Sequence, residues 1–138
     1  MPEFEIIDHT ADVGLLAYGS TRKEVFINAA AGMVSLITDP EKVNPVCQRE
    51  IALDADDYED LLVVWLNELL YLFDAENLIF SRFEITSLNH DSLSAIVQGE
   101  KIDLARHEIK TQVKAATYHQ IKLNSEEEGF SARIIFDI

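Results

Sequence analysis

Residues 4–18 read FEIIDHTADVGLLAY, and the rest of the chain is best interpreted from this stretch. Two short apolar runs, 4–7 and 13–17, flank the five polar or small residues 8–12. Short apolar runs separated by such a break are typical of two β-strands joined by a tight connection. The stretch therefore predicts that the chain opens with a pair of strands and that residues 8–12 form the loop between them.

The predicted loop contains Asp8, His9 and Asp12, which are two carboxylates and one imidazole. Asp side chains suit turns because they hydrogen-bond nearby backbone amides, and a purely structural loop is one interpretation. The other is a cation site, because Mg²⁺ and Ca²⁺ prefer loops rich in carboxylate oxygens. The loop offers at most three ligands, so a hard cation would need further oxygen atoms from elsewhere in the chain.

The remaining elements follow from hydrophobic spacing and turn residues. The pattern predicts helices over 21–36 and 56–74, and strands over 48–54, 79–85, 93–98, 113–123 and 130–136. Thr21 and Glu24 have the spacing of a capping box that opens the first helix. Residues 104–110 are predicted to be a polar connection, in which His107 is interpreted as an ordinary loop residue. The order of elements predicts one α+β domain over 1–138, a mostly antiparallel β-sheet with the two main α-helices packed on one face.

The second predicted helix is apolar around most of its circumference, which is typical of a buried helix. One polar stripe interrupts this pattern at three- and four-residue spacing. It comprises Asp60, Val64, Asn67, Glu68, Tyr71 and Asp74. We interpret the stripe as facing solvent, and the alternative is that Glu68 points toward the loop at 8–12.

Length and charge restrict the classes of function. The 138 residues, 48% of them hydrophobic, suffice for one domain with a hydrophobic core. Eleven Lys and Arg against 25 Asp and Glu give a net charge of −14. A charge of this sign repels phosphate, so strong direct nucleic-acid binding is disfavoured. It favours solubility, cation binding and docking onto a basic partner.

Membrane insertion and disulfide bonds are also disfavoured. The apolar runs are too short to cross a bilayer, and Glu3 and Glu5 stand where a signal peptide has its basic start. Cys47 is the single cysteine, so an internal disulfide is impossible and a cysteine-based zinc site is disfavoured. We expect a cytoplasmic protein.

The last predicted strand offers further oxygen ligands, because Asp137 precedes the carboxylate of Ile138. If this strand end meets the N-terminal loop, the two segments form an all-oxygen, net-negative site that suits Ca²⁺, Mg²⁺ or Mn²⁺. The oxygen donors of that site are Asp8, Asp12, Asp137 and the Ile138 carboxylate. A softer metal would also recruit histidines, for which the candidates are His9 and His119.

Lys114 is an isolated cation in an apolar predicted strand of an acidic protein. It either extends from a strand edge into solvent or is directed at a phosphate or a partner carboxylate. Enzyme templates fit poorly, because the sequence has no glycine-rich phosphate loop, G-x-S-x-G elbow or H-E-x-x-H motif. A two-carboxylate metal site can activate water, so a metal-dependent phosphohydrolase is kept as an alternative.

Several segments together resemble the archease family. They are HTADVG at 9–14, LL and WLNELLY within 61–71, Gly99-Glu100 with Arg106-His107, VKAATYH at 113–119, and IIFDI at 134–138. They follow the family order and span the whole chain at a family-typical length. The resemblance implies a protein cofactor, not an enzyme, that activates the GTP-dependent RNA ligase of tRNA splicing. It would promote guanylylation of the ligase's active-site histidine and allow multiple turnover.

The resemblance also implies roles for individual residues. Archeases bind a divalent cation through the Asp of the HTAD motif and the acidic C-terminal end, which correspond to Asp12, Asp137 and the Ile138 carboxylate. The lysine of the KAATYH segment, Lys114, corresponds to the candidate for the activating contact. Asp8 and Glu68 are weaker correspondences. A chaperone-like role toward tRNA-modifying enzymes, such as a tRNA methyltransferase, is the second function that the family suggests.

Overall fold

The computed structural model describes residues 3–8 and 12–138. The elements are β1 (Phe4–Asp8), β2 (Asp12–Gly19), α1 (Arg22–Ile37), the 3-10 helix η1 (Pro40–Lys42), β3 (Cys47–Asp54), α2 (Tyr58–Glu76), β4 (Leu78–Leu88), β5 (Ser92–Lys101), β6 (Ala115–Glu126) and β7 (Gly129–Asp137). Both predicted helices and all the predicted strands are present, with ends shifted by a few residues. The predicted loop at 8–12 falls largely on residues 9–11, which lie outside the described residues.

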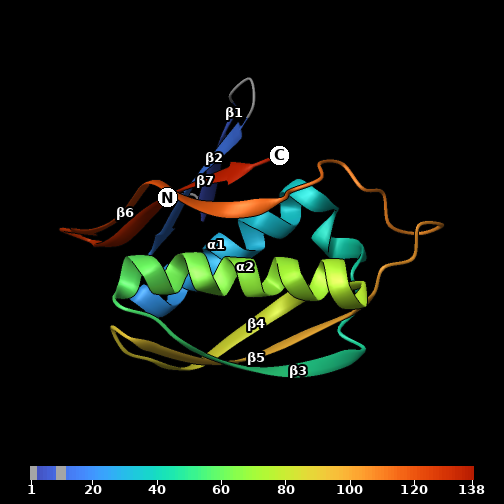
Figure 1. Ribbon diagram of the computed structural model, residues 1–138, viewed down its shortest axis with the longest axis horizontal. Helices are drawn as coiled ribbons and strands as arrows, with labels where there is room; N and C mark the ends of the chain where they lie inside the picture. The colour runs from blue at the N-terminus through green and yellow to red at the C-terminus, as the bar shows by residue number, and fades with distance from the viewer. Residues whose placement is uncertain (1–2, 9–11) are drawn as a thin grey trace.

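The described strands form two antiparallel sheets where the sequence predicted one. Their orders are β1-β2-β7-β6 and β3-β5-β4. Figure 1 shows one sheet above and the other below the two helices, which contact both. The α+β class is confirmed, but the helices lie between two sheets and not on one face of a single sheet. The reason lies in α2, because a helix that is apolar nearly all round needs apolar partners on more than one side.

Local sequence signals set the ends of the helices. The Thr21 side chain accepts a hydrogen bond from the backbone N–H of Glu24 (3.2 Å) and caps α1, as the capping-box spacing predicted. Asp57 caps α2 by accepting from the N–H of Asp60 (2.8 Å). Asn77 ends α2 in the left-handed conformation with φ 57°, which asparagine tolerates well.

Trp65 of α2 joins the layers of the core. Its side chain is 0% exposed, and its indole N–H donates to the carbonyl of Phe26 on α1 (3.0 Å). Its ring packs edge-on against Phe83 of β4, with ring centroids 6.1 Å apart. These contacts fix α2 relative to α1 and to the three-stranded sheet. Apolar as α2 is, none of the described helices has the length and hydrophobicity needed to cross a membrane.

The polar stripe of α2 faces β6 over part of its length. Asp60 accepts a hydrogen bond from the hydroxyl of Tyr118 (2.6 Å), and Asn67 hydrogen-bonds the backbone of Ala116. Tyr71, further along α2, is 61% exposed. The interpretation of the stripe as solvent-facing is therefore wrong for its first half. The reason is that the outer edge of β6 has no neighbouring strand, so its backbone groups need other partners.

Candidate functional site

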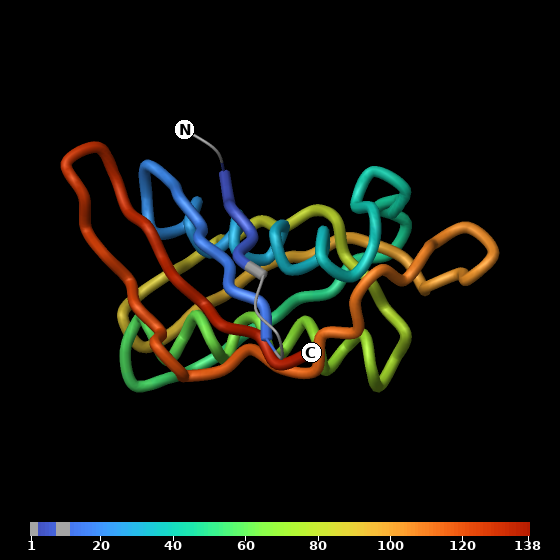
Figure 2. The backbone as a smooth tube through the Cα atoms, turned by 90° about the horizontal axis from the view of Figure 1, so that it is seen from above, coloured from blue at the N-terminus to red at the C-terminus, as the bar shows by residue number. Residues whose placement is uncertain are grey.

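The first residue of β2 and the last residue of β7 lie side by side. Asp12 and Asp137 are direct partners in the antiparallel register of these strands. Figure 2 shows β7 running beside β2 to the C-terminus. Side chains of directly opposed residues lie on the same face of a sheet, with Cβ atoms about 4.5–5.5 Å apart. The fold thus brings together two of the predicted ligand residues, with the half-buried Ile138 following in the chain.

Asp12 carries an unusual polar atom. Its Oδ1 is buried and has no hydrogen-bond partner among the described residues, and it is alone in this among their buried side-chain atoms. Leaving a buried acceptor unpaired costs about 1–3 kcal/mol, and more when the group is charged. Such an exception calls for a physical explanation. A bound cation is a suitable one, because Asp12, Asp137 and the Ile138 carboxylate are all oxygen donors.

The remaining candidate ligands are placed less closely. Among the described residues no group of three His, Cys, Asp or Glu side chains is arranged to hold a metal. The backbone of Asp8 pairs with Val13 at the end of β1, next to the start of β2. Glu68 is half-buried on α2, and among the described residues it belongs to no group of three such side chains that could hold a metal. His9 lies outside the described residues.

His119 lies in an irregular part of β6. The pairing of β6 with β7 is interrupted between Thr117 and Lys122, and Gln120 adopts φ 54° there. His119 is exposed within this bulge. Since Ala115 pairs with Asp137, the bulge begins further along β6 than the paired aspartates. His119 is therefore not aligned with Asp12 across the sheet.

The backbone of Lys114 is anchored by a hydrogen bond, whereas its side chain is exposed. Its N–H donates to the carbonyl of Asp137 (2.8 Å) immediately before β6 begins. Its side chain is exposed, and the ion pairs among the described residues do not include it. The structure thus places a cation that has no ion-pair partner among the described residues next to the strand end that carries Asp137.

His107 is not an ordinary loop residue, contrary to the interpretation from sequence. Its side chain is 0% exposed. Its Nδ1 accepts the backbone N–H of Asp103 (2.9 Å), so the ring proton lies on Nε2. Nε2 faces the carbonyl of Lys42 (3.0 Å) and the carboxylate of Glu100 (3.2 Å). The sequence signal that could have indicated this arrangement is the pair of family motifs Gly99-Glu100 and Arg106-His107, which on sequence alone supported only the family resemblance.

Glu100 is the centre of that arrangement. Its carboxylate accepts hydrogen bonds from the guanidinium of Arg106 (2.6 Å) and from the N–H of Asn44 (2.6 Å), in addition to its contact with His107. The hydrogen bond from Arg106 is the main cause that lowers the pKa of Glu100 from 4.5 to about 2. The arrangement ties the connection after β5 to the segment after η1, so its role is structural.

Glu100→Gln is expected to lower the free energy of unfolding by about 2 kcal/mol at neutral pH, because it removes the charged partner of Arg106. The loss is not larger because Arg106 is exposed and solvent screens part of the interaction. Because the pKa of Glu100 is depressed on folding, its ionised form stabilises the protein above about pH 4.5, and this is lost as the pH falls toward 2. Urea unfolding of both proteins between about pH 7 and pH 3 should show the difference shrinking. Glu84→Gln, on an exposed part of β4, is the control. A difference that stays constant with pH would contradict the assignment.

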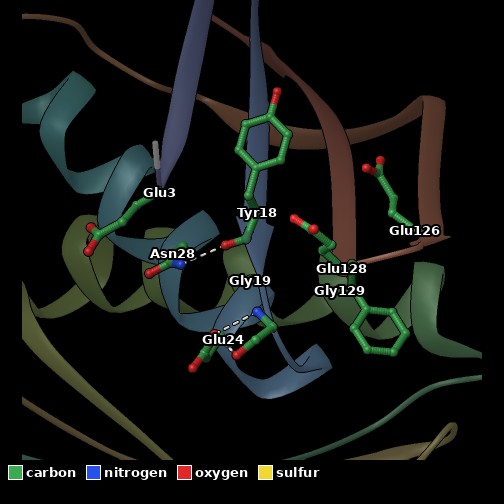
Figure 3. A pocket seen from close by; sticks show the side chains of 10 residues that line it. Glu3, Tyr18, Gly19, Glu24, Asn28, Glu126, Glu128 and Gly129 are labelled. Atoms are coloured by element: carbon green, nitrogen blue, oxygen red, sulfur yellow. Dashed lines mark hydrogen bonds between the residues drawn. The ribbon is translucent and has the colours of Figure 1, made fainter. Parts of the chain in front are cut away.

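A groove of about 470 Å³ lies at the other end of β2. Figure 3 shows Tyr18, Glu24 and Asn28 on one side of it and Glu126 and Glu128 on the other. The acidic turn between β6 and β7 is visible in the sequence, but its position opposite the start of α1 is not. Asp12 begins β2, whereas Tyr18 and Gly19 at the far end of that strand line the groove, and none of the predicted ligand residues that the structure describes lines it.

These features define a small acidic α+β domain that carries paired aspartates and a fixed lysine at one end of its four-stranded sheet. The chain belongs to the archease family, because residues 4–138 match the family described as "Archease protein family (MTH1598/TM1083)". The resemblance stated from the sequence motifs is thereby confirmed.

Curated relatives and solved structures agree with this assignment. The chain is 44% identical to protein archease of Saccharolobus islandicus over the full length of both, and 41% identical to that of Methanosarcina mazei over 99% of this chain and 96% of the relative. The solution structure of protein 1598 of Methanobacterium thermoautotrophicum has a TM-score of 0.83, 34% identity and full coverage of both chains. A crystal structure from Thermotoga maritima, described as an archease and possible chaperone, has a TM-score of 0.65 at 20% identity over 96% of this chain and 94% of that one, and it supports the fold alone.

Proposed function

We propose that this protein is an accessory activator of the GTP-dependent RNA ligase of tRNA splicing, and not an enzyme in its own right. In this role it promotes guanylylation of the ligase's active-site histidine and allows multiple turnover. The proposal combines the family assignment with one observation, the buried Oδ1 of Asp12 that has no partner among the described residues and lies on the strand position opposite Asp137.

In this proposal a divalent cation is held by Asp12, Asp137 and the carboxylate of Ile138. An all-oxygen donor set suits Ca²⁺, Mg²⁺ or Mn²⁺ and not a soft metal. When bound, the cation supplies positive charge at the end of β2 and β7. The carboxylate of Asp12 then has a partner for its buried oxygen, and the repulsion between the two aspartates is offset.

Lys114 is the proposed contact with the ligase. Its side chain is exposed, while its backbone is anchored on Asp137 by the 2.8 Å hydrogen bond. An ammonium group stabilises negative charge that develops on a triphosphate during nucleotidyl transfer, and it does so best where water is excluded. Docking onto the ligase provides that exclusion in this proposal.

The net charge of −14 supports docking onto a basic ligase surface. Attraction between unlike surfaces is screened by salt, because the Debye length falls to about 3 Å at 1 M ionic strength. Half-maximal activation should therefore require at least about tenfold more protein at 0.5 M salt than at 0.05 M. Ligase guanylylation measured at each salt concentration without this protein is the control. Activation that is independent of salt would contradict electrostatic docking.

A ligase turnover assay tests the function itself. Purified cognate ligase, GTP and a divalent cation are mixed with cleaved tRNA, with and without this protein. We expect more guanylylated ligase and repeated turnover only when the protein is present. A ligase that turns over equally well alone would overturn the proposed function.

A chaperone-like role is the second candidate, favoured by the description of the Thermotoga maritima relative as a possible chaperone. Its partner would be a tRNA-modifying enzyme such as a tRNA methyltransferase. Under this alternative, Asp12→Ala and Asp137→Ala leave the solubility of the methyltransferase on co-expression unchanged. Loss of ligase activation in the same variants would favour the cofactor role.

A further inference from the structure

The side chain of Asn67 hydrogen-bonds the outer edge of β6 at one residue, Ala116. β6 is the last strand of its sheet, so one side of its backbone has no neighbouring strand. The Asn67 side chain donates from Nδ2 to the carbonyl of Ala116 (3.0 Å) and accepts the N–H of Ala116 at Oδ1 (2.8 Å). Because a side-chain amide carries a donor and an acceptor in one plane, it replaces the peptide group that an adjacent strand would supply.

This contact lies two residues from Lys114. Ala115 and Ala116 pair with Asp137 and Phe136 of β7, and the N–H of Lys114 bonds the carbonyl of Asp137. The segment 114–116 is therefore held by β7 along one edge and by Asn67 along the other. The regular pairing with β7 is interrupted between Thr117 and Lys122, so the anchored segment 114–116 is separated by this bulge from the other backbone contact of α2 with β6, in which Glu59 accepts the N–H of Leu123 (2.9 Å).

Asn67 is itself held in place by the core. It is half-buried, and its neighbours on α2 include Leu66 and Leu69, which are 0% and 4% exposed. α2 is fixed further by Trp65. A rigid helix thus carries the amide that positions the strand.

We propose that Asn67 is a positioning residue for Lys114, which holds the 114–116 backbone so that the lysine side chain starts from a defined point beside Asp137. The inference rests on the proposed activating role of Lys114. Without the amide, the N–H and carbonyl of Ala116 bond water, and the segment samples more conformations. Lys114 then occupies its productive position for a smaller fraction of the time, which lowers the maximal effect on the ligase.

The test compares Asn67→Ala with Tyr118→Phe. Both variants remove a side-chain hydrogen bond between α2 and β6, but the Tyr118–Asp60 contact lies past the point where regular pairing with β7 stops. Asn67→Ala should lower maximal guanylylation of the ligase by about tenfold at saturating protein. The protein concentration for half-maximal effect should stay unchanged. Tyr118→Phe should keep the maximal effect, and thermal unfolding confirms that each variant is folded.

A double-mutant cycle with Lys114→Ala separates positioning from general damage. If Asn67 acts through Lys114, adding Asn67→Ala to Lys114→Ala causes no further loss of activation. Asn67→Asp, which keeps the acceptor for the Ala116 N–H but loses the donor, should fall between wild type and Asn67→Ala. It serves as the second variant if Asn67→Ala does not fold.

Three results would overturn the proposal: full activation by folded Asn67→Ala, an equal loss in Tyr118→Phe, or losses that multiply in the double mutant. Failure of the proposed function would give a different result. In that case wild type and Lys114→Ala do not differ in the same assay, and the role of Asn67 in activation is rejected together with that of Lys114.

Discussion

Asp12→Asn is expected to lower the affinity of the protein for Ca²⁺, Mg²⁺ or Mn²⁺ by at least about 100-fold. The amide keeps the shape of the side chain, but it removes the negative charge that a hard cation requires. Isothermal titration of the isolated protein measures this effect without the ligase. Asp54→Asn, at the exposed end of β3, makes the same change in net charge and should bind the cation as wild type does.

The same substitution should change stability in a direction that depends on the cation. Without metal, the free energy of unfolding of Asp12→Asn should equal that of wild type or exceed it by up to about 1 kcal/mol. The reason is that burying a neutral amide costs less free energy than burying a carboxylate oxygen without a partner. At a cation concentration of 100 times the wild-type dissociation constant, wild type should gain about 2.7 kcal/mol, and the variant, whose affinity is at least about 100-fold weaker, should gain at most about 0.4 kcal/mol. An equal gain in both proteins would place the cation elsewhere.

Lys114→Ala is expected to lower maximal ligase guanylylation by about 100-fold, which is the scale seen when one group that stabilises developing charge is removed. Cation affinity should stay the same or rise slightly, because a positive charge near Asp137 has been removed. A lower maximal rate of guanylylation, with an unchanged protein concentration for half-maximal effect, would show that the lysine acts after docking. Lys114→Arg keeps the charge and should recover part of the activity.

Lys122→Ala is the matched control for this prediction. It removes an exposed lysine from β6, the strand that Lys114 immediately precedes, at a position beyond the bulge and away from Asp137. Both variants change the net charge equally, so any general electrostatic effect on docking appears in both. If Lys122→Ala reduced activation as much as Lys114→Ala, total charge and not the position of Lys114 would be responsible.

The helices and strands were predictable because their signals are local. Thr21 and Glu24 lie three residues apart and close a capping contact by themselves. The alternation of apolar residues along β5 predicts a half-buried strand without reference to its neighbours, and every second residue of its interior is indeed buried. The division of these strands into two sheets was not predictable, because it depends on which strands pair across the sequence.

The polar residues that contact distant segments, the buried His107 and the half-buried Asn67, were the hardest to interpret. His107 and Asn67 occupy positions that are usually polar surface, and their sequence neighbours do not indicate what they contact. His107 contacts the carboxylate of Glu100 and the carbonyl of Lys42, while Asn67 hydrogen-bonds the backbone at the outer edge of β6. Both partners come from other segments, so single-sequence periodicity does not predict them.

The sequence by itself determined the α+β class, the acidic surface, the family and the candidate residues Asp12, Asp137 and Lys114, because these depend on composition, spacing and motif. Only the tertiary structure decided that Asp12 is opposite Asp137, that Lys114 is anchored on Asp137, and that Asn67 holds the strand beside it. These are contacts between distant parts of the chain. They form only when the strands adopt one register around the buried helices, since a shift of one residue would turn each side chain to the other face of the sheet.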